Sequence, residues 1–224
     1  MISVVIPTLD AAAHLPRSLA PLAPAAVDGL VREVVISDGG SSDATCIIAD
    51  DVGAVLVEGP KGRGRQLIAG AARAKSAWLL FLHVDTVLED GWAEEAARFI
   101  GADPMRAAAF RFAFDDGAPS ARAAEWWVRL RCSLLALPYG DQGLLISRAF
   151  YEALGGFRDL PLMEDVDLVR RIGRARLTLL KSRAVTSAEK YRRDGYGKRA
   201  RRNLVLLTRY LMGADPARLA AKYD

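Results

Sequence analysis

One stretch of the sequence decides the fold class, Trp78-Leu79-Leu80-Phe81-Leu82-His83-Val84-Asp85-Thr86. Its first five residues are apolar without alternation, which is typical of a strand buried on both faces between helices. Three similar runs precede it along the chain, at residues 2–6, 34–36 and 54–57. Helical patterns lie between the runs, at residues 11–22, 43–51 and 65–75. This alternation predicts an α/β domain with a Rossmann-like, mostly parallel sheet flanked by helices.

The second part of the chain is less regular. Phe110, Phe112 and Phe114 alternate with smaller or charged residues, which predicts a strand with one buried face. Further elements are predicted as a helix at 118–135, a short strand ending at Ser147, a helix to about Leu154, a helix from about Met163, and a basic amphipathic helix from Lys198. The sequence has no internal repeat or low-complexity linker, so residues 1–224 are predicted to form a single domain.

The composition excludes several classes of protein. About half of the 224 residues are apolar, so we expect a packed core. Two distant cysteines, Cys46 and Cys132, exclude a disulfide scaffold and a cysteine-based zinc site. The first residues break at Pro7 without a basic leader, and no apolar run reaches the roughly 20 residues that span a bilayer. We therefore expect a cytoplasmic protein.

Ligands of doubly wound sheets bind at the carboxyl ends of the strands. This rule selects four segments, residues 7–10, 38–43, 58–66 and 83–86. In the second segment, Asp38 suits a base edge or a ribose hydroxyl, but Asp-Gly followed by a serine is also a common turn. Either Ser41 or Ser42 is a candidate N-cap for the helix that follows. In the third segment, three glycines and three cations suit a diphosphate, or simply a solvated basic loop.

Acidic residues at two places in the sequence are candidates for chemistry. Asp85 follows the strongest apolar run, where a carboxylate can hold a hard divalent cation or merely cap the end of the strand. Glu164 and Asp165 stand at a predicted helix start with Asp167. One of them can act as a general base. Acids in a first helical turn also complement the helix dipole, so a purely structural role stays open.

These segments, in this order, resemble the family 2 glycosyltransferases of the GT-A fold over roughly residues 2–180. The resemblance rests on six segments: Val4-Val5-Ile6-Pro7-Thr8 with Asp10, Asp38-Gly39-Gly40-Ser41-Ser42-Asp43, Gly64-Arg65-Gln66, Leu82-His83-Val84-Asp85-Thr86, Gly155-Gly156-Phe157 and Glu164-Asp165. It implies an inverting, hexosyltransferase-type transfer from a nucleoside-diphosphate sugar, usually UDP-linked, to an acceptor hydroxyl. The acceptor is not identified by the sequence, and no nucleic-acid partner is expected.

The resemblance also implies roles for individual residues. The nucleotide would lie against Pro7, Thr8, Asp10, Asp38, Gly39, Arg63, Arg65, Gln66 and Val84. Asp85 would bind Mg²⁺ or Mn²⁺ on the diphosphate, and Asp165 would deprotonate the acceptor with Glu164 beside it. Asp141 and Gln142 would line the donor-sugar or acceptor pocket. The domain would divide into a nucleotide-sugar part (1–115), an acceptor and catalytic-base part (116–190) and a basic helical tail (191–224).

The sequence departs from the family pattern at the metal site. His83 stands where the family has the first aspartate of Asp-x-Asp, so one carboxylate is offered where two are usual. The same histidine excludes a haloacid-dehalogenase-type phosphatase, which needs that aspartate as its nucleophile. A nucleotidyltransferase is excluded because no glycine-rich basic loop follows the first strand. A non-catalytic nucleotide-sugar-binding or membrane-surface module stays open as the alternative.

Basic residues concentrate between Lys190 and Arg202, and an apolar run, residues 204–207, follows them directly. The cations can lie on anionic lipid, which would make the protein peripheral on the inner membrane face. Alternatively, the apolar face packs inward, against the sheet or against the helix that carries Trp126 and Trp127. In an intermediate version, the cations flank the active site and attract an anionic acceptor or the diphosphate.

Overall fold

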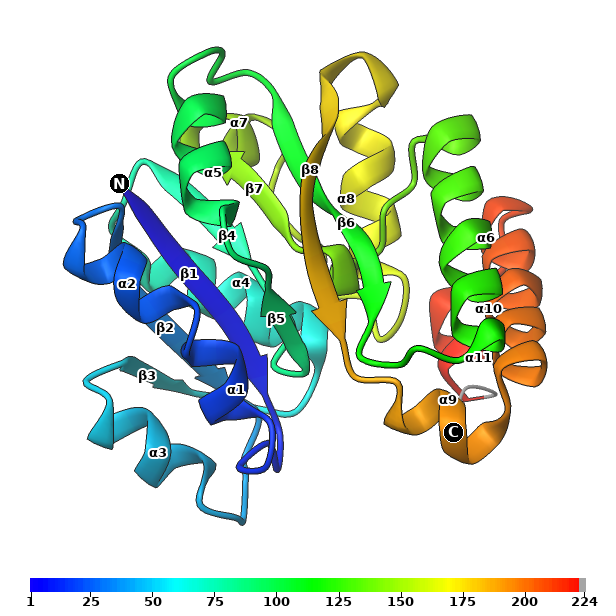
Figure 1. The fold of residues 1–224 in the computed structure, drawn as a ribbon, viewed down its shortest axis with the longest axis horizontal. Helices are drawn as coiled ribbons and strands as arrows, with labels where there is room; N and C mark the ends of the chain where they lie inside the picture. Colours follow the sequence, from blue (N-terminus) through cyan, green and yellow to red (C-terminus); the bar gives the residue numbers. More distant parts are fainter. Residues whose placement is uncertain (222–224) are drawn as a thin grey trace.

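The computed structural model describes residues 1–221, which fold around one eight-stranded sheet covered by helices (Figure 1). The strands are β1 (Ile2–Thr8), β2 (Val31–Asp38), β3 (Val55–Glu58), β4 (Trp78–Phe81), β5 (Thr86–Leu88), β6 (Ala107–Phe114), β7 (Leu144–Ser147) and β8 (Leu177–Thr186). Their order across the sheet is β3-β2-β1-β4-β7-β6-β8-β5. The predicted α/β class, with a mostly parallel sheet flanked by helices, is confirmed.

Helices connect the strands and cover both faces of the sheet. The α-helices are α1 (Leu15–Leu19), α2 (Leu22–Val27), α3 (Thr45–Asp51), α4 (Arg63–Arg73), α5 (Trp92–Ile100), α6 (Pro119–Leu135), α7 (Arg148–Ala153), α8 (Glu164–Ile172), α9 (Glu189–Asp194), α10 (Tyr196–Leu211) and α11 (Pro216–Ala220). Two short 3₁₀ helices complete the set, η1 (Gly140–Gln142) and η2 (Arg174–Arg176).

The first four strands form the parallel half of the sheet. β1 pairs in parallel with both β2 and β4, and β2 pairs in parallel with β3. β1 and β4 are buried along their whole lengths, because helices cover both faces of the sheet at these strands. Val4 and Ile6 belong to the core on one face, and Val5 with Leu79 to the core on the other. The apolar runs therefore predicted these strands correctly.

Two local predictions in this half are wrong. The segment predicted as one helix, residues 11–22, contains the short helix α1, and α2 begins only at Leu22. Prolines at positions 16, 21 and 24 explain the break, since proline is tolerated in a first helical turn but not inside a helix. Ser41 and Ser42 do not cap the helix that follows either. α3 begins at Thr45 without a side-chain cap. The Ser41 hydroxyl donates to Asp38 at the end of β2, and the Ser42 hydroxyl donates to Asp10 in the turn after β1.

The second half of the sheet is mixed. β7 is antiparallel to β4 and β6, β8 is parallel to β6, and β5 is antiparallel to β8. β8 thus lies between β6 and β5, and it is the only strand that pairs with β5 in the described part of the chain. Thr86 and Thr186 face each other in this pairing, and their hydroxyl oxygens are 2.9 Å apart. The turn that carries Asp85 is therefore held by a strand about a hundred residues later in the chain.

The C-terminal part contains three helices where one was predicted. α9 ends at Asp194, Gly195 turns the chain with a φ of 87°, and α10 starts at Tyr196 rather than at Lys198. α10 lies beside α6 at one end of the molecule (Figure 1). Leu206 and Leu207 on its inner side pack with Met163 and Val166. Within residues 1–221, no helix is both long and apolar enough to cross a membrane.

Candidate active site

A cleft with a volume of roughly 150 Å³ opens between the carboxyl end of β4 and the C-terminal helices. Its polar lining comes from five separate parts of the chain: Arg63, His83, Asp85, Tyr139, Asp141, Asp165, Thr186, Ser187, Lys190, Tyr191, Arg199 and Asn203. Four of these residues were predicted from the sequence to bind substrate or metal or to act in catalysis, namely Arg63, Asp85, Asp141 and Asp165. A fifth, His83, directly precedes the predicted residue Val84.

The turn after β4 brings His83 and Asp85 into the cleft. The Thr86 amide donates to the His83 carbonyl, and the Ser187 amide after β8 donates to the Asp85 carbonyl at 3.0 Å. The Asp85 carboxylate is about one-fifth exposed and lies 4.0 Å from the Lys190 ammonium. Burial and the nearby Arg63 cation lower the pKa of His83 to about 4, although Asp85 and Asp165 oppose the shift. The imidazole is therefore neutral at neutral pH.

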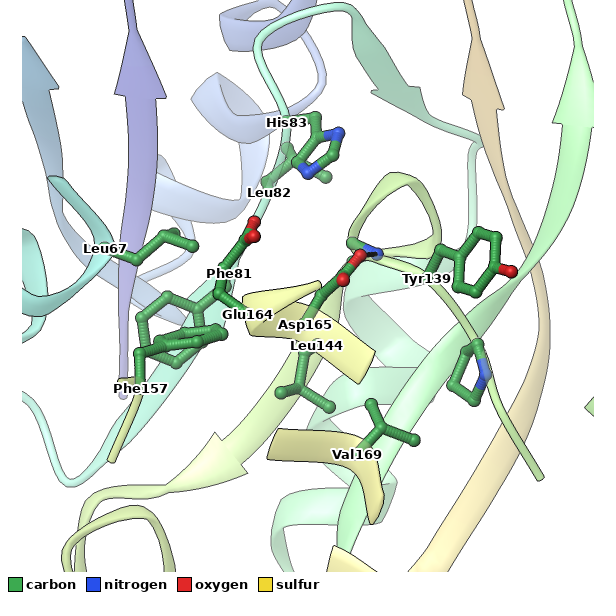
Figure 2. Close-up of a pocket in the computed structure, with 13 residues that line it drawn as sticks. Leu67, Phe81, Leu82, His83, Tyr139, Leu144, Phe157, Glu164, Asp165 and Val169 are labelled. Atoms are coloured by element: carbon green, nitrogen blue, oxygen red, sulfur yellow. Dashed lines mark hydrogen bonds between the residues drawn. The ribbon is translucent and has the colours of Figure 1, made fainter. Parts of the chain in front are cut away.

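Asp165 stands in the first turn of α8, where its carboxylate meets the backbone of η1. Oδ2 accepts a hydrogen bond of 2.7 Å from the Gly140 amide. Figure 2 shows the carboxylates of Glu164 and Asp165 on the side of α8 that faces His83. Gly140 has no side chain because there is no room for one: an added Cβ would lie 2.5 Å from His83 Nε2. Glycine at this position thus leaves room for the His83 imidazole while its amide reaches the Asp165 carboxylate.

Glu164 differs from Asp165 in being almost fully buried, with 1% of its surface exposed. Oε1 forms an ion pair with Nε of Arg63, at the start of α4. Oε2 is buried and has no hydrogen-bond partner among the described residues. Burial raises the pKa of Glu164, although Arg63 opposes the shift. Glu164 therefore joins α8 to the glycine-rich segment after β3.

Asp141 and Gln142, predicted as a pair, lie in different surroundings. Asp141 lines the cleft, and its buried Oδ1 has no hydrogen-bond partner in residues 1–221. Burial raises the pKa of Asp141 to about 6, with Arg131 opposing and the Asp165 and Asp85 charges adding to the shift. Gln142 points into the core, where Nε2 donates to the Phe110 carbonyl at 2.9 Å. Only Asp141 is available to a ligand in the cleft.

The turns after β1 and β2 hold the predicted nucleotide residues Thr8, Asp10 and Asp38. Asp38 is 1% exposed, and its two carboxylate oxygens accept four hydrogen bonds, from the Gly40 and Ser41 amides and the Thr8 and Ser41 hydroxyls. Burial opposes ionisation, but these bonds lower the pKa of Asp38. Asp10 is exposed, with a φ of 47°, and accepts from the Ser42 amide at 2.8 Å. Hydrogen bonds within the protein therefore already engage both carboxylates.

The remaining predicted nucleotide residues lie around the same turns or outside them. Gln66 is buried and donates to the carbonyls of Thr8 and Ser37 at 2.6 and 2.9 Å, tying β1 to β2. Gly39 allows this close approach, since a Cβ there would lie 3.0 Å from the Gln66 amide nitrogen. Arg65 faces outward and pairs with Asp159 at 2.9 Å. Pro7 is buried in β1, and Val84 packs against the core. None of these residues lines the described cleft.

The wall opposite Asp85 is basic and comes from α9 and α10. Lys190 and Arg199 line it, with Tyr191 and Asn203 between them. Arg199 is 91% buried and donates to Asp194 Oδ2 at 2.7 Å, but its Nε has no hydrogen-bond partner among the described residues. No sequence pattern pointed to Tyr139, Thr186 and Ser187, which are brought to the cleft by η1 and β8. The concentration of basic residues between Lys190 and Arg202 was evident in the sequence, and Lys190 lines the cleft.

A divalent cation fits this cleft if the phosphates of the bound substrate supply most of the ligands of the cation. No group of three or more histidine, cysteine, aspartate and glutamate side chains in residues 1–221 is arranged to hold a metal alone. Mg²⁺, however, is commonly held by one or two carboxylates together with substrate phosphates. Asp85 lines the cleft, and the unpartnered Oδ1 of Asp141 belongs to the same lining. Both offer the hard oxygen ligands that such a cation prefers.

Comparisons with known proteins identify the family and the fold. The family model described as glycosyl transferase family 2 matches residues 3–148. A crystal structure of a mycobacterial protein has a TM-score of 0.58 at 21% identity, over 84% of this chain and 65% of that chain. Glucosyl-3-phosphoglycerate synthase from Mycobacterium tuberculosis, in complex with Mn²⁺, UDP and glucosyl-3-phosphoglycerate, has a TM-score of 0.57 at 22% identity. That alignment covers 83% of this chain and 70% of that chain.

The same synthase solved with Mn²⁺, UDP-glucose and phosphoglyceric acid matches at 22% identity and a TM-score of 0.57, over 81% of this chain and 69% of that chain. At these identities the likeness establishes the shared fold. The chain spans about two-thirds of the length of these solved proteins. No curated protein matches the chain in sequence.

Proposed function

Since the chain belongs to glycosyl transferase family 2, we propose that it transfers a sugar from a nucleoside-diphosphate sugar to an acceptor hydroxyl with inversion. The observation that carries the proposal is the convergence of Arg63, Asp85 and Asp165 on one cleft from three separate elements. A UDP-linked hexose is the proposed donor. Its support is that the similar glucosyl-3-phosphoglycerate synthase was crystallised with UDP-glucose.

In the proposed reaction the acceptor hydroxyl lies against Asp165. The carboxylate takes the hydroxyl proton while the acceptor oxygen attacks the anomeric carbon of the donor sugar. The bond between that carbon and the diphosphate oxygen breaks, and its electron pair leaves with the nucleoside diphosphate. Attack from the face opposite the leaving group inverts the anomeric configuration. The Gly140 amide fixes Oδ2 of Asp165, which orients the carboxylate for proton transfer.

The leaving diphosphate needs positive charge around it. Asp85, with Asp141, would hold Mg²⁺ or Mn²⁺, and the cation would neutralise the developing charge on the diphosphate. Arg63 and Lys190 line the same cleft and supply fixed positive charge of the protein itself. His83 is neutral and so adds no repulsion to a cation at Asp85. These assignments give Asp85, Asp141, Arg63 and Lys190 roles in donor binding, and Asp165 a role at the acceptor.

A thermal-shift screen of nucleoside diphosphates with and without Mn²⁺ tests the proposal. A true ligand present at a hundredfold its Kd adds about 2.7 kcal/mol of stability, so UDP with Mn²⁺ should raise the Tm clearly. The Asp85→Ala variant should keep its own Tm but lose the part of the shift that requires Mn²⁺. An unchanged Mn²⁺ effect in this variant would show that Asp85 is not the metal ligand. No shift with any nucleoside diphosphate would reject the proposed donor.

Catalysis is then separated from binding by the products. Incubation with UDP-sugars and Mn²⁺ should release UDP slowly through hydrolysis of the donor, even without the natural acceptor. Binding of UDP without any release from a panel of UDP-sugars would favour the alternative, a non-catalytic nucleotide-sugar-binding module. That alternative draws its support from His83, which stands in place of a second carboxylate.

A further inference from the structure

The outer side of α6 exposes large apolar residues to solvent. Trp126 and Trp127 are 54% and 63% exposed, and their rings pack edge to face with centroids 5.2 Å apart. Leu134 follows at helical spacing and is also exposed. The opposite side of the helix packs inward through Ala121 and Cys132. Two neighbouring exposed tryptophans on one helix face are unusual for a surface that meets only water.

α10 repeats this pattern directly beside α6. Its inner side carries Leu206 and Leu207 into the core, whereas Leu204 and Val205 on the other side, and Met212 directly after the helix, are exposed. The two helices contact each other at one end of the molecule (Figure 1). The sequence left open that the apolar face of this helix packs inward. Leu206 and Leu207 are buried, so inward packing is confirmed for these two residues. Both tryptophans of α6 and the outer residues of α10 are exposed.

The exposed charged residues of these two helices are all cations. The exposed cations are Arg122 and Arg129 on α6, and Lys198, Arg201 and Arg209 on α10. α10 contains no acidic residue, and the single acid of α6 is Glu125. The Glu125 side chain is 14% exposed, and its Oε1 accepts a hydrogen bond of 2.8 Å from the Phe114 amide of β6. Its Oε2 lies 3.7 Å from Nη1 of Arg122, so Arg122 is paired and the other four cations carry the charge of the exposed sides. The exposed sides of α6 and α10 therefore combine apolar and aromatic residues with cations and offer no free carboxylate.

We propose that this α6–α10 surface, formed by Trp126, Trp127, Leu134, Leu204, Val205 and Met212 with the cations around them, binds peripherally to an anionic lipid bilayer. Tryptophan prefers the boundary between lipid headgroups and acyl chains, where its ring is apolar and its N–H stays hydrated. Lysine and arginine beside it meet the anionic headgroups. A protein partner would need an acidic surface with apolar pockets of matching shape. An anionic bilayer provides negative charge and an apolar interior, and it needs no matching shape.

Vesicle co-sedimentation of the whole protein tests the proposal. Neutral phosphatidylcholine vesicles are compared with vesicles that contain about one-third phosphatidylglycerol, at 50 mM and 300 mM salt. We expect at least tenfold stronger partitioning to the anionic vesicles at 50 mM salt, and a marked loss at 300 mM because salt screens the cations. Equal binding to both kinds of vesicle, or no binding, would overturn the proposal.

Two pairs of matched variants assign the binding to this surface. Trp126→Ser with Trp127→Ser should weaken binding to anionic vesicles at least tenfold, whereas Val27→Ser with Ile47→Ser, which removes exposed apolar residues from α2 and α3, should not. Lys198→Glu with Arg201→Glu should abolish the preference for anionic lipid. Arg73→Glu with Arg98→Glu, an equal change of charge elsewhere, should preserve most of it.

Equal losses in a variant and its control would show that binding does not depend on this surface, which would reject the proposal. Light scattering provides the remaining test. If the tryptophan variant changes the molar mass of the protein in solution but not its vesicle binding, the surface is an interface between copies of the chain, and the lipid proposal is wrong. Neither readout depends on the donor, so failure here leaves the proposed transfer reaction untouched.

Discussion

The turns after β1 and β2 and the cleft beside β4 are both rich in polar residues, but they differ in how those residues are satisfied. In the turns, the oxygens of Asp38 accept four hydrogen bonds from the protein itself. In the cleft, Oδ1 of Asp141 and Nε of Arg199 are buried without a hydrogen-bond partner in the described part of the chain, and so is Oε2 of Glu164 beside it. A polar atom buried without a partner is costly and calls for an explanation.

This difference in hydrogen bonding separates two groups of residues. Those in the turns hold the backbone of the site in place, and those in the cleft have polar atoms that a ligand can bind. A nucleoside near the turns would meet carboxylates that already hold the backbone in place. A ligand in the cleft would meet polar atoms that gain a partner when it binds. We therefore expect substitutions in the turns to act on stability, and substitutions in the cleft to act on activity. The predictions below test that division, starting with the largest expected effect.

The Asp165→Asn variant should lower kcat by roughly 10² to 10⁴ while the Kd for UDP changes little. The amide oxygen can still accept the hydrogen bond from the Gly140 amide, so only the proton acceptor is lost. Steady-state rates and UDP titrations on the same preparation measure both quantities. Glu164→Gln serves as the companion variant. If that variant loses the activity and Asp165→Asn does not, the two carboxylates have exchanged roles.

The Asp38→Ala variant should lower the free energy of unfolding by about 2 to 4 kcal/mol, because four donors lose their acceptor. Urea denaturation measures the loss, with the exposed Asp28→Ala as control. The pKa of Asp38 is lowered, so its contribution is present above the ordinary aspartate pKa and is lost as the pH falls through the lowered value. A variant that stays stable but no longer binds UDP would make Asp38 a ligand rather than a structural residue.

The Gly140→Ala variant should cost about 1 to 3 kcal/mol of stability and also reduce activity, since the new methyl group would collide with the His83 ring. The backbone around Asp165 would have to move to relieve the contact. Gly117→Ala is the matched control, because a Cβ at that exposed position meets no atom within 4 Å. Thermal unfolding and UDP release should single out position 140. Equal behaviour of the two variants would mean that the close approach of His83 has no consequence.

The Asp141→Asn variant should be more stable than the parent at neutral pH, by about 1 to 2 kcal/mol without added metal. The pKa of this carboxyl is raised to about 6, so the folded protein holds its proton where the unfolded chain has released it. Ionisation therefore costs stability as the pH rises from about 4 to 6, and the cost persists above that range. Tm values at pH 7.5 and pH 4 should show the gain only at pH 7.5. A gain of the same size at both would exclude the charge as its cause.

The sequence predicted the parallel half of the sheet well because burial on both faces leaves a plain signal. The runs at residues 2–6, 34–36, 54–57 and 78–82 correspond to β1 to β4. β5 and β8 were missed. β8 includes Lys181, Ser182 and Arg183, so it lacks a continuous apolar run, and β5 has only three residues. Their pairing joins residues about a hundred positions apart, which no local pattern reveals.

The candidate site was predicted to a similar extent. The rule of strand ends predicted Asp85, and the acidic pair at a helix start predicted Glu164 and Asp165. Asp85 and Asp165 line the cleft, and Glu164 lies beside it. The orientation of individual side chains was not predictable. Gln142 turns into the core while its neighbour Asp141 faces the cleft, because the 3₁₀ turn of η1 sends successive side chains in different directions. The roles of these residues remain predictions.

The pairing of β5 with β8 has a consequence for the synthesis of this chain. Asp85 leaves the ribosome well before β8, and about a hundred residues separate the two paired strands. At translation rates of about 5 to 20 residues per second, the ribosome needs roughly 5 to 20 s to make that interval. During this time β5 and the outer edge of β6 have no strand partner, and unpaired strand edges invite association with other chains. The nascent polypeptide thus carries Asp85 beside an unpaired strand until β8 has been made, and the basic wall from α9 and α10 is made later still.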